Sequence, residues 1–509
     1  MLEVSPVGLE PATSGDITRT TPFFCSGFAF IEIELSFKND NSFQGMLYLG
    51  EEVRRIASIS ILALLIVTLF VLAFNTRLAK TEATTIVVPD DYPTIQGAIN
   101  AANDEDTVFV RNGTYYENVT VNKTISLTGE NKHNTIIDGG GSGTVLEVFH
   151  TSNVSLRDFT IRNGKMGLVL NEAGYTQMRN VSLAGSTYNF KFSEGPLWKH
   201  FCQDIDASNT IEGRPIYFWV NRQDETIHSD AGFVALINCS QITIQDLNLT
   251  NNWHGILAIE LKDSLIKNIM ISNTFQALSM RGVSNSVIQE IVAKNSGVGI
   301  ILYHCDQNIL SDNIVANNSD GIILQMTRNN TIERNTIINS SEYHMSTGIH
   351  LSYAHKNKIV GNNIASNNCG IVLYESSNNS IYHNNFVDNN QQIVADGFLA
   401  LDSWDNGCEG NYWNNYDGTD LDGDGVGDIY LPWEGVDYYP LVTPYWNPAD
   451  VNHDLKVDIY DAVLVCAAYS STPSNPHWNP HCDIAEPYGV IDIYDVVMIC
   501  MSYGEEYLP

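Results

Sequence analysis

The chain has 509 residues, enough for several domains. Its 26 basic and 59 acidic residues give a formal net charge of −33, so no nucleic acid or anionic lipid surface is expected as its main partner. Its nine cysteines contain no Cys-x-x-Cys pair, so nothing indicates zinc binding or thioredoxin-like redox chemistry.

The N-terminal region divides into two parts. Residues 1–45 contain the segment Gly8–Gly15, which resembles a translated upstream extension that recurs in gene models, and we expect the natural chain to start at Met46. An uncharged run over residues 56–74 is long enough to cross a bilayer. We predict that residues 46–83 are a secretory signal or an uncleaved membrane anchor, which places the rest of the chain outside the cell.

The segment that follows is predicted to close the end of a repeat structure. Ile95, Ala98, Ile99 and Ala102 have the spacing of one helix face. A stack of strands needs such a cap, because an uncovered end coil exposes unpaired strand edges.

A repeat of 22 residues dominates the middle of the chain. Gly299, Gly321, Gly348 and Gly370 each precede a short apolar segment, at steps of 22, 27 and 22 residues. A fixed period of this length, built from short β-type segments and Asn, Gly or Ser turns, is typical of a solenoid. The five extra residues in the second step predict a loop near residues 340–346.

Within the repeat, the first and third positions after the glycine are apolar, whereas the position between them admits Ser279 and His350. This alternation predicts a half-buried strand whose middle residue faces solvent. A second ladder consists of asparagines whose side chains can hydrogen-bond along the stack. Its members are Asn313, Asn335, Asn362 and Asn384.

Repeats such as Asn330–Asn335 resemble the right-handed parallel β-helices of the NosD type and of the carbohydrate-binding and sugar hydrolase (CASH) type. The resemblance extends over roughly residues 85–445. It implies an all-β, right-handed parallel β-helix over residues 84–400 and a NosD-type terminal segment over residues 401–445. It is specific for the fold and says little about activity.

The repeat fails between residues 185 and 231, where polar, aromatic and titratable residues are concentrated. A long excursion of this kind is a usual place for a binding site on a solenoid, although it can also be a structural cap. Sugar recognition requires aromatic faces beside carboxylates and arginine. The candidate ligand-binding residues in the excursion and on the adjacent outward positions are Trp198, His200, Asp204, Arg214, Trp219, His254, Arg281, Tyr303 and His304.

The sequence leaves the catalytic residues, if any, undefined. Hydrolysis of the polygalacturonase type requires clustered carboxylates whose motifs are missing from the sequence, and a lyase could use Arg281 or Arg334 as its base. A NosD-type role in copper maturation would depend on His344, Met345 and His350.

The terminal segment contains an Asp-x-Asp-x-Asp-Gly-x-Gly-Asp run. Carboxylates at alternate positions of a loop kinked by glycine are hard oxygen ligands, which Ca²⁺ requires. The predicted ligands are Asp420, Asp422, Asp424 and Asp428.

Residues 446–504 contain a duplication with a step of 34 residues and resemble a dockerin, in which two Ca²⁺ loops each precede a helix. The resemblance implies a first loop made by Asp450, Asn452, Asp454, Lys456 (through its carbonyl), Asp458 and Asp461. The second loop keeps only Asp483, Asp492 and Asp495, so we expect it to bind metal weakly or not at all. Cys466 and Cys500 occupy equivalent positions and are expected in the core of this module.

These observations predict an exported or surface-anchored β-helix that binds a glycan or cell-wall polysaccharide, with a Ca²⁺-dependent module for assembly with a cohesin-like partner. A polysaccharide lyase or hydrolase, a passive adhesin or surface-layer spacer, and a NosD-type copper-maturation protein remain as alternatives.

Overall fold

The protein is described from a computed structural model, which separates into two compact units, residues 1–81 and 82–509. In the first unit only a helix over residues 55–68 is described, so residues 1–45 and part of the expected segment 56–74 lie outside the described residues. Among the described helices, none is both long and apolar enough to cross a membrane. The described residues are 55–68, 82–193, 197–228, 230–340, 346–396, 401–445, 449–452, 456–479, 482–485 and 489–504.

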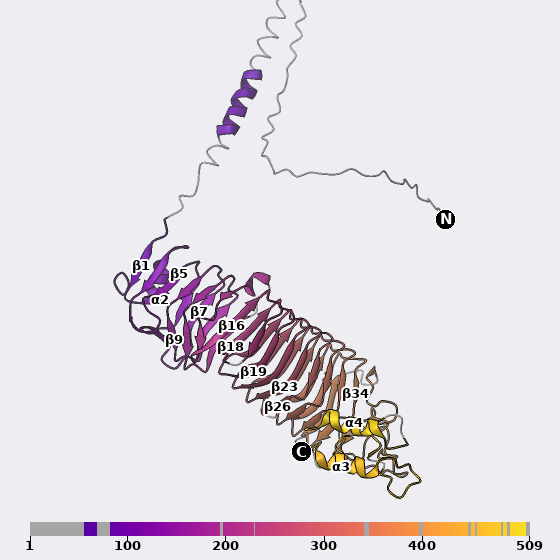
Figure 1. The fold of residues 1–509 in the computed structure, drawn as a ribbon. Helices are drawn as coiled ribbons and strands as arrows, with labels where there is room; N and C mark the ends of the chain where they lie inside the picture. Colours follow the sequence, from indigo (N-terminus) through magenta and orange to yellow (C-terminus); the bar gives the residue numbers. More distant parts are fainter. Residues whose placement is uncertain are drawn as a thin grey trace, which may run out of the picture. The chain divides into compact units, whose positions relative to one another are not determined.

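Residues 85–211 form a stack of coils, which we call the N-terminal stack (Figure 1). It begins with helix α2 (Ile95–Ala101), whose N-cap Thr94 accepts a hydrogen bond from the Gly97 amide, and whose apolar face is buried as a cap. The strands stack as three sheets. The first has β1 (Thr85–Val88), β2 (Thr107–Val110), β5 (Ser126–Gly129), β8 (Ser155–Arg157), β11 (Gln177–Arg179) and β14 (Asp204–Ile205); the second has β4 (Val119–Val121), β7 (Thr144–Phe149), β10 (Met166–Asn171) and β13 (Tyr188–Ser193); the third has β3 (Gly113–Tyr116), β6 (Thr135–Asp138), β9 (Thr160–Arg162), β12 (Ser182–Ala184) and β15 (Thr210–Ile211).

Residues 214–413 form a second stack of coils, which we call the C-terminal stack. One of its sheets continues the third sheet of the N-terminal stack beyond β15. Its strands are β16 (Arg214–Val220), β18 (Phe233–Ile237), β20 (His254–Ile259), β22 (Gln276–Arg281), β24 (Val298–Tyr303), β27 (Asp320–Gln325), β30 (Thr347–Ser352), β33 (Cys369–Tyr374) and β36 (Gln391–Asp396). The other has β17 (Thr226–His228), β19 (Thr243–Thr250), β21 (Leu265–Ser272) and β23 (Val287–Lys294), then β25 (Ile309–Ser311), β26 (Ile314–Ala316), β28 (Thr331–Glu333), β29 (Thr336–Ile338), β31 (Lys358–Val360), β32 (Asn363–Ala365), β34 (Ser380–Tyr382), β35 (Asn385–Val387) and β37 (Tyr412–Trp413).

The chain reverses direction where the two stacks meet. Strand β15 pairs with β16 in antiparallel register, with Ile211 opposite Arg214. The two residues between them, Glu212 and Gly213, have φ angles of +50° and +80°. Positive φ at both positions is the requirement of a tight hairpin turn, and glycine adopts it without strain. The pairs after β16 in the shared sheet are parallel again, so the region between residues 185 and 231 joins two β-helical stacks.

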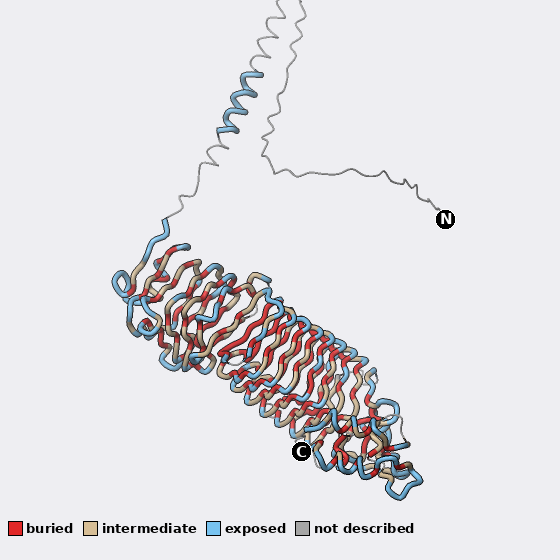
Figure 2. Tube along the Cα trace, viewed as in Figure 1, coloured by how far each residue is buried: buried red, intermediate tan, exposed pale blue. Residues whose placement is uncertain are grey.

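Strands β18 and β20 of the C-terminal stack are buried on both faces (Figure 2). Alternate residues of β18 belong to different cores. Val234 and Leu236 pack in the core of the C-terminal stack, whereas Phe233 and Ala235 pack in the core of the N-terminal stack. The sheet β16–β18–β20 is therefore a wall shared by the two cores.

The predicted register of the C-terminal stack is confirmed. Gly299, Gly321, Gly348 and Gly370 lie one above another, and a Cβ atom at Gly348 would lie 2.6 Å from the carbonyl oxygen of Gly370, so a larger residue would not fit there. The expected solvent-facing row holds only in part. Ser279, on the outer face, is only 6% exposed, because this side of the first coils lies at the join, where the two stacks meet.

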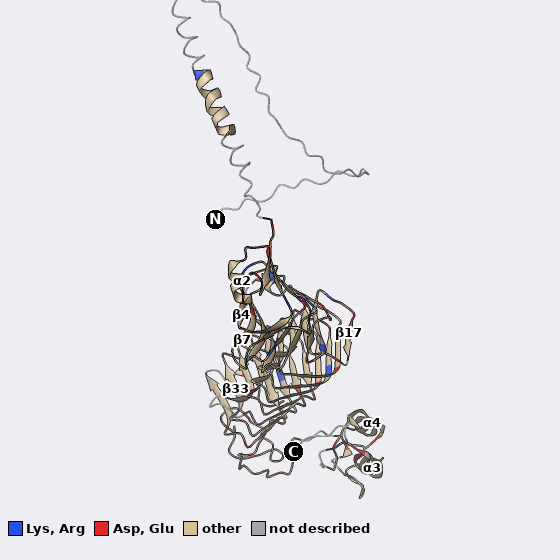
Figure 3. Ribbon diagram, turned by 90° about the vertical axis from the view of Figure 1, so that its left-hand side faces the viewer, with Lys and Arg blue, Asp and Glu red and all other residues tan. Residues whose placement is uncertain are grey.

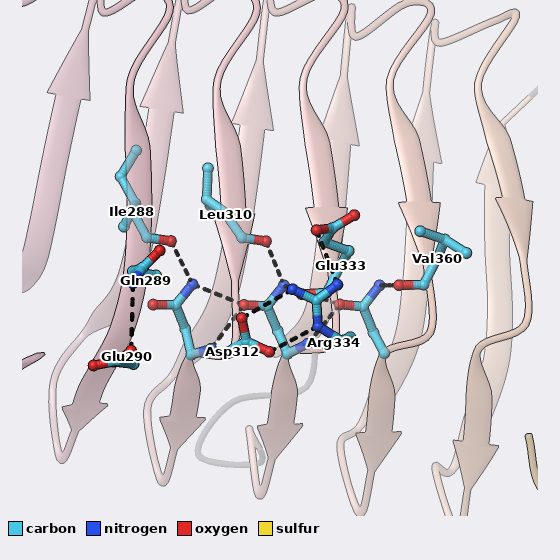
Figure 4. Close-up of polar contacts among 11 residues, drawn as sticks. Ile288, Gln289, Glu290, Leu310, Asp312, Glu333, Arg334 and Val360 are labelled. Atoms are coloured by element: carbon cyan, nitrogen blue, oxygen red, sulfur yellow. Dashed lines mark hydrogen bonds and ion pairs between the residues drawn. The ribbon is translucent and has the colours of Figure 1, made fainter. Parts of the chain in front are cut away.

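The asparagine ladder is also confirmed (Figure 4). The Asn335 side chain accepts hydrogen bonds from the backbone and side-chain amides of Asn313 and donates to the Leu310 carbonyl at 2.9 Å. The sequence analysis missed a parallel ladder of Asn308, Asn330, Asn357 and Asn379. These ladders satisfy buried backbone amides at the turns, which would otherwise be costly. The predicted loop near residues 340–346 lies mostly outside the described residues.

Two helices lie near the C-terminus, α3 (Ile459–Ala468) and α4 (Ile493–Ser502). Each begins directly after an aspartate N-cap, Asp458 or Asp492, and has a capping box. Cys466 and Cys500 are exposed and not in the core as expected, because each helix directs other residues inward. The core of this module includes Val465, Ala468 and Ile499.

Candidate functional site

Rings and a guanidinium group come together where the two stacks meet. Trp198, in the short helix η1 (Trp198–His200), lies with its ring 5.8 Å from that of Phe201. The guanidinium carbon of Arg281 lies 5.9 Å from the Phe201 ring centroid and 5.3 Å from that of Tyr303. The Tyr303 ring in turn contacts the His304 ring, with centroids 4.3 Å apart. We call Trp198, Phe201, Arg281, Tyr303 and His304 the aromatic row.

The aromatic row takes residues from both stacks. Phe201 follows β13 and is held in the N-terminal core by Phe192, at 6.0 Å. Arg281 and Tyr303 end β22 and β24 and are paired in register, so they lie side by side on the outer face of the C-terminal stack. His304 is in the next turn with φ of +53°, and its side chain is exposed. The row exists because the join brings these segments together.

Further exposed rings follow the same edge of the C-terminal stack. Tyr353 and Tyr374 are 44% and 40% exposed and have ring centroids 5.5 Å apart. Met326, 39% exposed, occupies the corresponding turn of the coil between them and His304. Successive coils rise by about 4.8 Å, so these exposed side chains lie one after another along the stacking direction, between the exposed Glu260 and Glu375 of the same turn.

The other candidate residues do not join this surface. His200 is 5% exposed, Asp204 forms an ion pair with Arg179 at 2.5 Å, and Arg214 donates to the Asn248 carbonyl. Trp219 packs against the core of the C-terminal stack.

His254 was expected on the outer surface, but it is only 3% exposed. Burial, together with the nearby Lys191 charge, lowers its pKa to about 3, so the imidazole is neutral near pH 7. Its Nδ1 atom has no hydrogen-bond partner.

The geometry gives little support to a catalytic role of the expected kind. Arg334 is held by both carboxylate oxygens of Asp312, at 2.9 and 3.0 Å, and by Glu333 (Figure 4). Asp320 is the sole carboxylate in the strands from β20 to β33 of the shared sheet. Burial raises its pKa and lowers that of His350, one coil further on. One carboxylate on this face does not supply the acid and base of a hydrolase.

Within the described residues, one group of side chains has the spacing of a metal site. Ligand atoms of Asp420, Asp422 and Asp428 all lie within 4.8 Å of one another. The Gly425 and Gly423 amides donate to Asp420 and hold its pKa below the usual range, whereas the Asp424 charge raises the pKa of Asp422. A bound cation would relieve this repulsion between carboxylates.

The dockerin-like loops bring fewer of their expected ligands together. Asp461 is buried and accepts from the Asn452 and Asp458 amides at 3.1 and 2.8 Å. Asp495 accepts in the same way from the amides of Ile484, Ala485 and Asp492, and Asp483 accepts from Gly489 at 2.6 Å. Asp450 is buried, Lys456 is exposed, and Asp454 lies outside the described residues.

Copper fits the described residues poorly. Copper sites use imidazole, thiolate or thioether ligands, whereas the carboxylate group above offers only hard oxygen atoms. His344 and Met345 lie outside the described residues, and His350 is paired in register with Ile323 and Val372 on the outer face.

A family model described as "Periplasmic copper-binding protein (NosD)" matches residues 207–418. This segment is close to the C-terminal stack. The match and the strand topology together identify a parallel β-helix protein, as the sequence predicted. No curated protein matches the chain.

Several solved structures are similar at low identity. The A-module of mannuronan C-5 epimerase AlgE6 from Azotobacter vinelandii is 17% identical with a TM-score of 0.28, over 59% of this chain and 90% of that one. The alginate lyase from Paenibacillus sp. str. FPU-7 is 13% identical with a TM-score of 0.25, over 61% of this chain and 99% of that one. The DFA-IIIase from Arthrobacter chlorophenolicus A6, without its lid, is 10% identical with a TM-score of 0.30, over 64% and 93%. At this similarity no argument about activity follows.

Proposed function

We propose that the protein is an exported β-helix that binds a polysaccharide on the aromatic row. One observation carries the proposal: Trp198, Arg281 and Tyr303, contributed by two separate stacks, are linked by ring and cation contacts through the buried Phe201 ring. Aromatic rings offer flat apolar faces for the C–H groups of a sugar, and arginine offers several hydrogen-bond donors for its hydroxyls. The exported location is supported by the apolar segment before the first coil and by the periplasmic description of the matching family.

Binding without turnover is favoured over the lyase and hydrolase alternatives. Asp320 is the sole carboxylate in the strands from β20 to β33 of the shared sheet, and it lies at the end of β27 away from the aromatic row. The ion pairs of Arg334 occupy one of the two guanidinium groups, Arg281 and Arg334, that a lyase could use as its base. A passive spacer remains the competing class, and it would require no organised surface of rings.

The test is glycan binding with a simultaneous assay for degradation. Trp198→Ala and Tyr303→Ala should each weaken binding about tenfold, because a ring contact that the bound sugar covers contributes roughly 1 to 2 kcal/mol to binding. Tyr116→Ala is the control, because Tyr116 is 75% exposed in β3 of the N-terminal stack. Equal affinity in all three variants would contradict the proposal, and product release from the bound glycan would favour an enzyme.

A second function, assembly, is supported by the duplicated C-terminal helices. Ile459, Tyr460 and Val463 are 55%, 66% and 55% exposed on α3, and the equivalent residues of α4 are exposed as well. A repeated apolar patch of this kind is typical of a docking surface. We propose that it binds a cohesin-like partner. Tyr460→Asp combined with Tyr494→Asp should abolish binding to such a partner while leaving glycan binding intact.

We also propose Ca²⁺ as the ion held by Asp420, Asp422 and Asp428, with Asp424 adjacent, and by the loop that ends in Asp461, whereas the loop that ends in Asp495 is expected to bind it weakly or not at all. Carboxylate clusters of this chemistry suit Ca²⁺. An ion that binds only the folded protein stabilises it by about 2.7 kcal/mol at a hundredfold excess over Kd. Chelator should therefore lower the melting temperature, and Asp428→Asn should reduce the response. An unchanged melting temperature would contradict the assignment.

A further inference from the structure

A second cation lies on an aromatic surface near the aromatic row. Lys191 is on the outer face of β13, and its Nζ atom lies 3.9 Å from the centroid of the Trp253 ring. Trp253 is stacked on Phe275, with centroids 4.0 Å apart and an interplanar angle of 19°, and contacts Tyr188 edge-on at 5.5 Å. Phe275 is 40% exposed, so the end of this stack reaches the surface.

Several cations of the outer faces have a carboxylate partner. Arg111, Arg162 and Arg179 each form an ion pair with an aspartate of a neighbouring coil. Lys191 forms no ion pair with any described residue. The chain has 59 acidic and 26 basic residues, and Figure 3 marks those that lie in the described part of the chain.

Within the described part of the chain, Glu147 is the charge that acts on Lys191 from nearby. Burial lowers the pKa of the Lys191 ammonium, and the charge of Glu147 opposes this shift from two strands away. Glu147 itself accepts a hydrogen bond from Asn171 at 2.9 Å. His254 is close enough for Lys191 to depress its pKa, and it is neutral near pH 7. The ammonium is thus partly desolvated. Its contact with the face of the Trp253 indole ring offsets part of the free-energy cost of that desolvation.

The position of Lys191 relates it to the aromatic row through β22. Phe275 directly precedes β22, and Arg281 ends it. Six residues of extended strand span about 20 Å, and the outward side chains between the two ends are Gln276 and Ser279. The Trp253–Phe275 stack and Arg281 therefore lie at opposite ends of β22, and Ser279 between them is 6% exposed.

We propose that Lys191 binds a fixed anionic substituent of the glycan, a carboxylate or an ester sulfate, and so selects acidic over neutral polysaccharides. This inference rests on the proposed glycan binding and adds the chemical class of the ligand. An anion would give the ammonium a partner, which it lacks among the described residues, in a partly desolvated setting where a charge-assisted hydrogen bond is strong. The overall negative charge of the protein would oppose polyanions elsewhere on its surface, which confines their binding to this place.

The test compares matched ligands and matched variants of the whole protein. The ligands are a polyuronate, its carboxyl-reduced neutral form, and a sulfated derivative of that neutral form, measured by calorimetry at two salt concentrations. The variants are Lys191→Gln and Lys191→Arg. Lys358→Gln is the control, because Lys358 also lies over a ring, that of Tyr382 at 5.7 Å, but on the other sheet.

The wild-type protein should prefer an acidic ligand, and Lys191→Gln should reduce its affinity about tenfold while leaving neutral binding unchanged. Lys191→Arg should retain the preference, and Lys358→Gln should behave as the wild type. The carboxylate and sulfate ligands identify which anion is bound. Equal binding of neutral and acidic forms, or an acidic preference that survives Lys191→Gln, would overturn this inference and leave glycan binding intact. Failure to bind any of the three ligands would overturn both.

Discussion

The regular coils of the C-terminal stack and the join between the stacks are built from similar residues, but their side chains make contacts in different patterns. In the regular coils, each inward position repeats every 22 or 27 residues, and each contact is made with the equivalent residue one coil away. At the join, Phe190 contacts Phe233 and Phe192 contacts Phe218, between segments of different stacks. The repeat contacts maintain the stack, whereas the contacts at the join are specific to this one place.

This difference indicates where function can arise. A repeat presents the same kind of residue on every coil, so its outer face changes slowly along the stack. The join interrupts the repeat and places Phe201 beside Arg281 and Lys191 beside Trp253. Both proposed binding features therefore depend on the packing of the two stacks against each other.

The largest expected effect is produced by opening the join. Phe233 is fully buried in the shared wall, with its ring 5.1 Å from that of Phe190. Phe233→Ala removes a large buried ring and should lower the free energy of unfolding by about 3 to 5 kcal/mol, measured by urea denaturation. Phe149→Ala, at a 39% exposed position, is the control. A loss similar to that of the control would mean that the stacks do not depend on this contact.

The same division between repeat and join separates the features that the sequence predicted from those that it did not. The glycine and asparagine ladders were predictable because each position appears several times, so that chance similarity is averaged out. The join was not, because it occurs once. Its sequence contains a usable signal, Glu212-Gly213 between two apolar strands, which is the composition of a tight hairpin. Phe201 of the aromatic row was missed, since nothing in its local sequence shows that it lies next to Arg281.

The individual site residues show the limit of reasoning from local pattern. Trp198, Arg281, Tyr303 and His304 come together as one surface. His254 shares the strand position of outward residues and yet is buried, because the N-terminal stack lies against that end of β20. Alternation assigns a residue to a face of a sheet, but only the tertiary structure determines what covers that face.

An intermediate effect is expected from interrupting the asparagine ladder. Asn335→Ala leaves the buried Asn313 amide without its acceptor and removes the side-chain donor to the Leu310 carbonyl. The free energy of unfolding should fall by about 2 to 3 kcal/mol, since each buried unsatisfied group costs roughly 1 to 3 kcal/mol. Thr336→Ala, on the adjacent strand with a partly exposed side chain, serves as the control. A loss below about 0.5 kcal/mol would show that water replaces the ladder.

The smallest effect is expected on the outer face of the same coil. Arg334 makes a bidentate ion pair with Asp312, but the two side chains are 38% and 39% exposed. Such surface pairs contribute about 0.2 to 1 kcal/mol, because water and salt screen them and because two long side chains lose freedom. Arg334→Ala should lower the unfolding free energy by this amount in dilute buffer, and by less in 1 M salt. Arg334→Lys should retain part of the contribution, since the charge remains but the bidentate geometry is lost. A salt-independent loss above about 2 kcal/mol would contradict this prediction. It would show that exposed outward residues stabilise the coils as strongly as the buried inward ladders. Burial could then no longer explain the contrast between the repeat and the join.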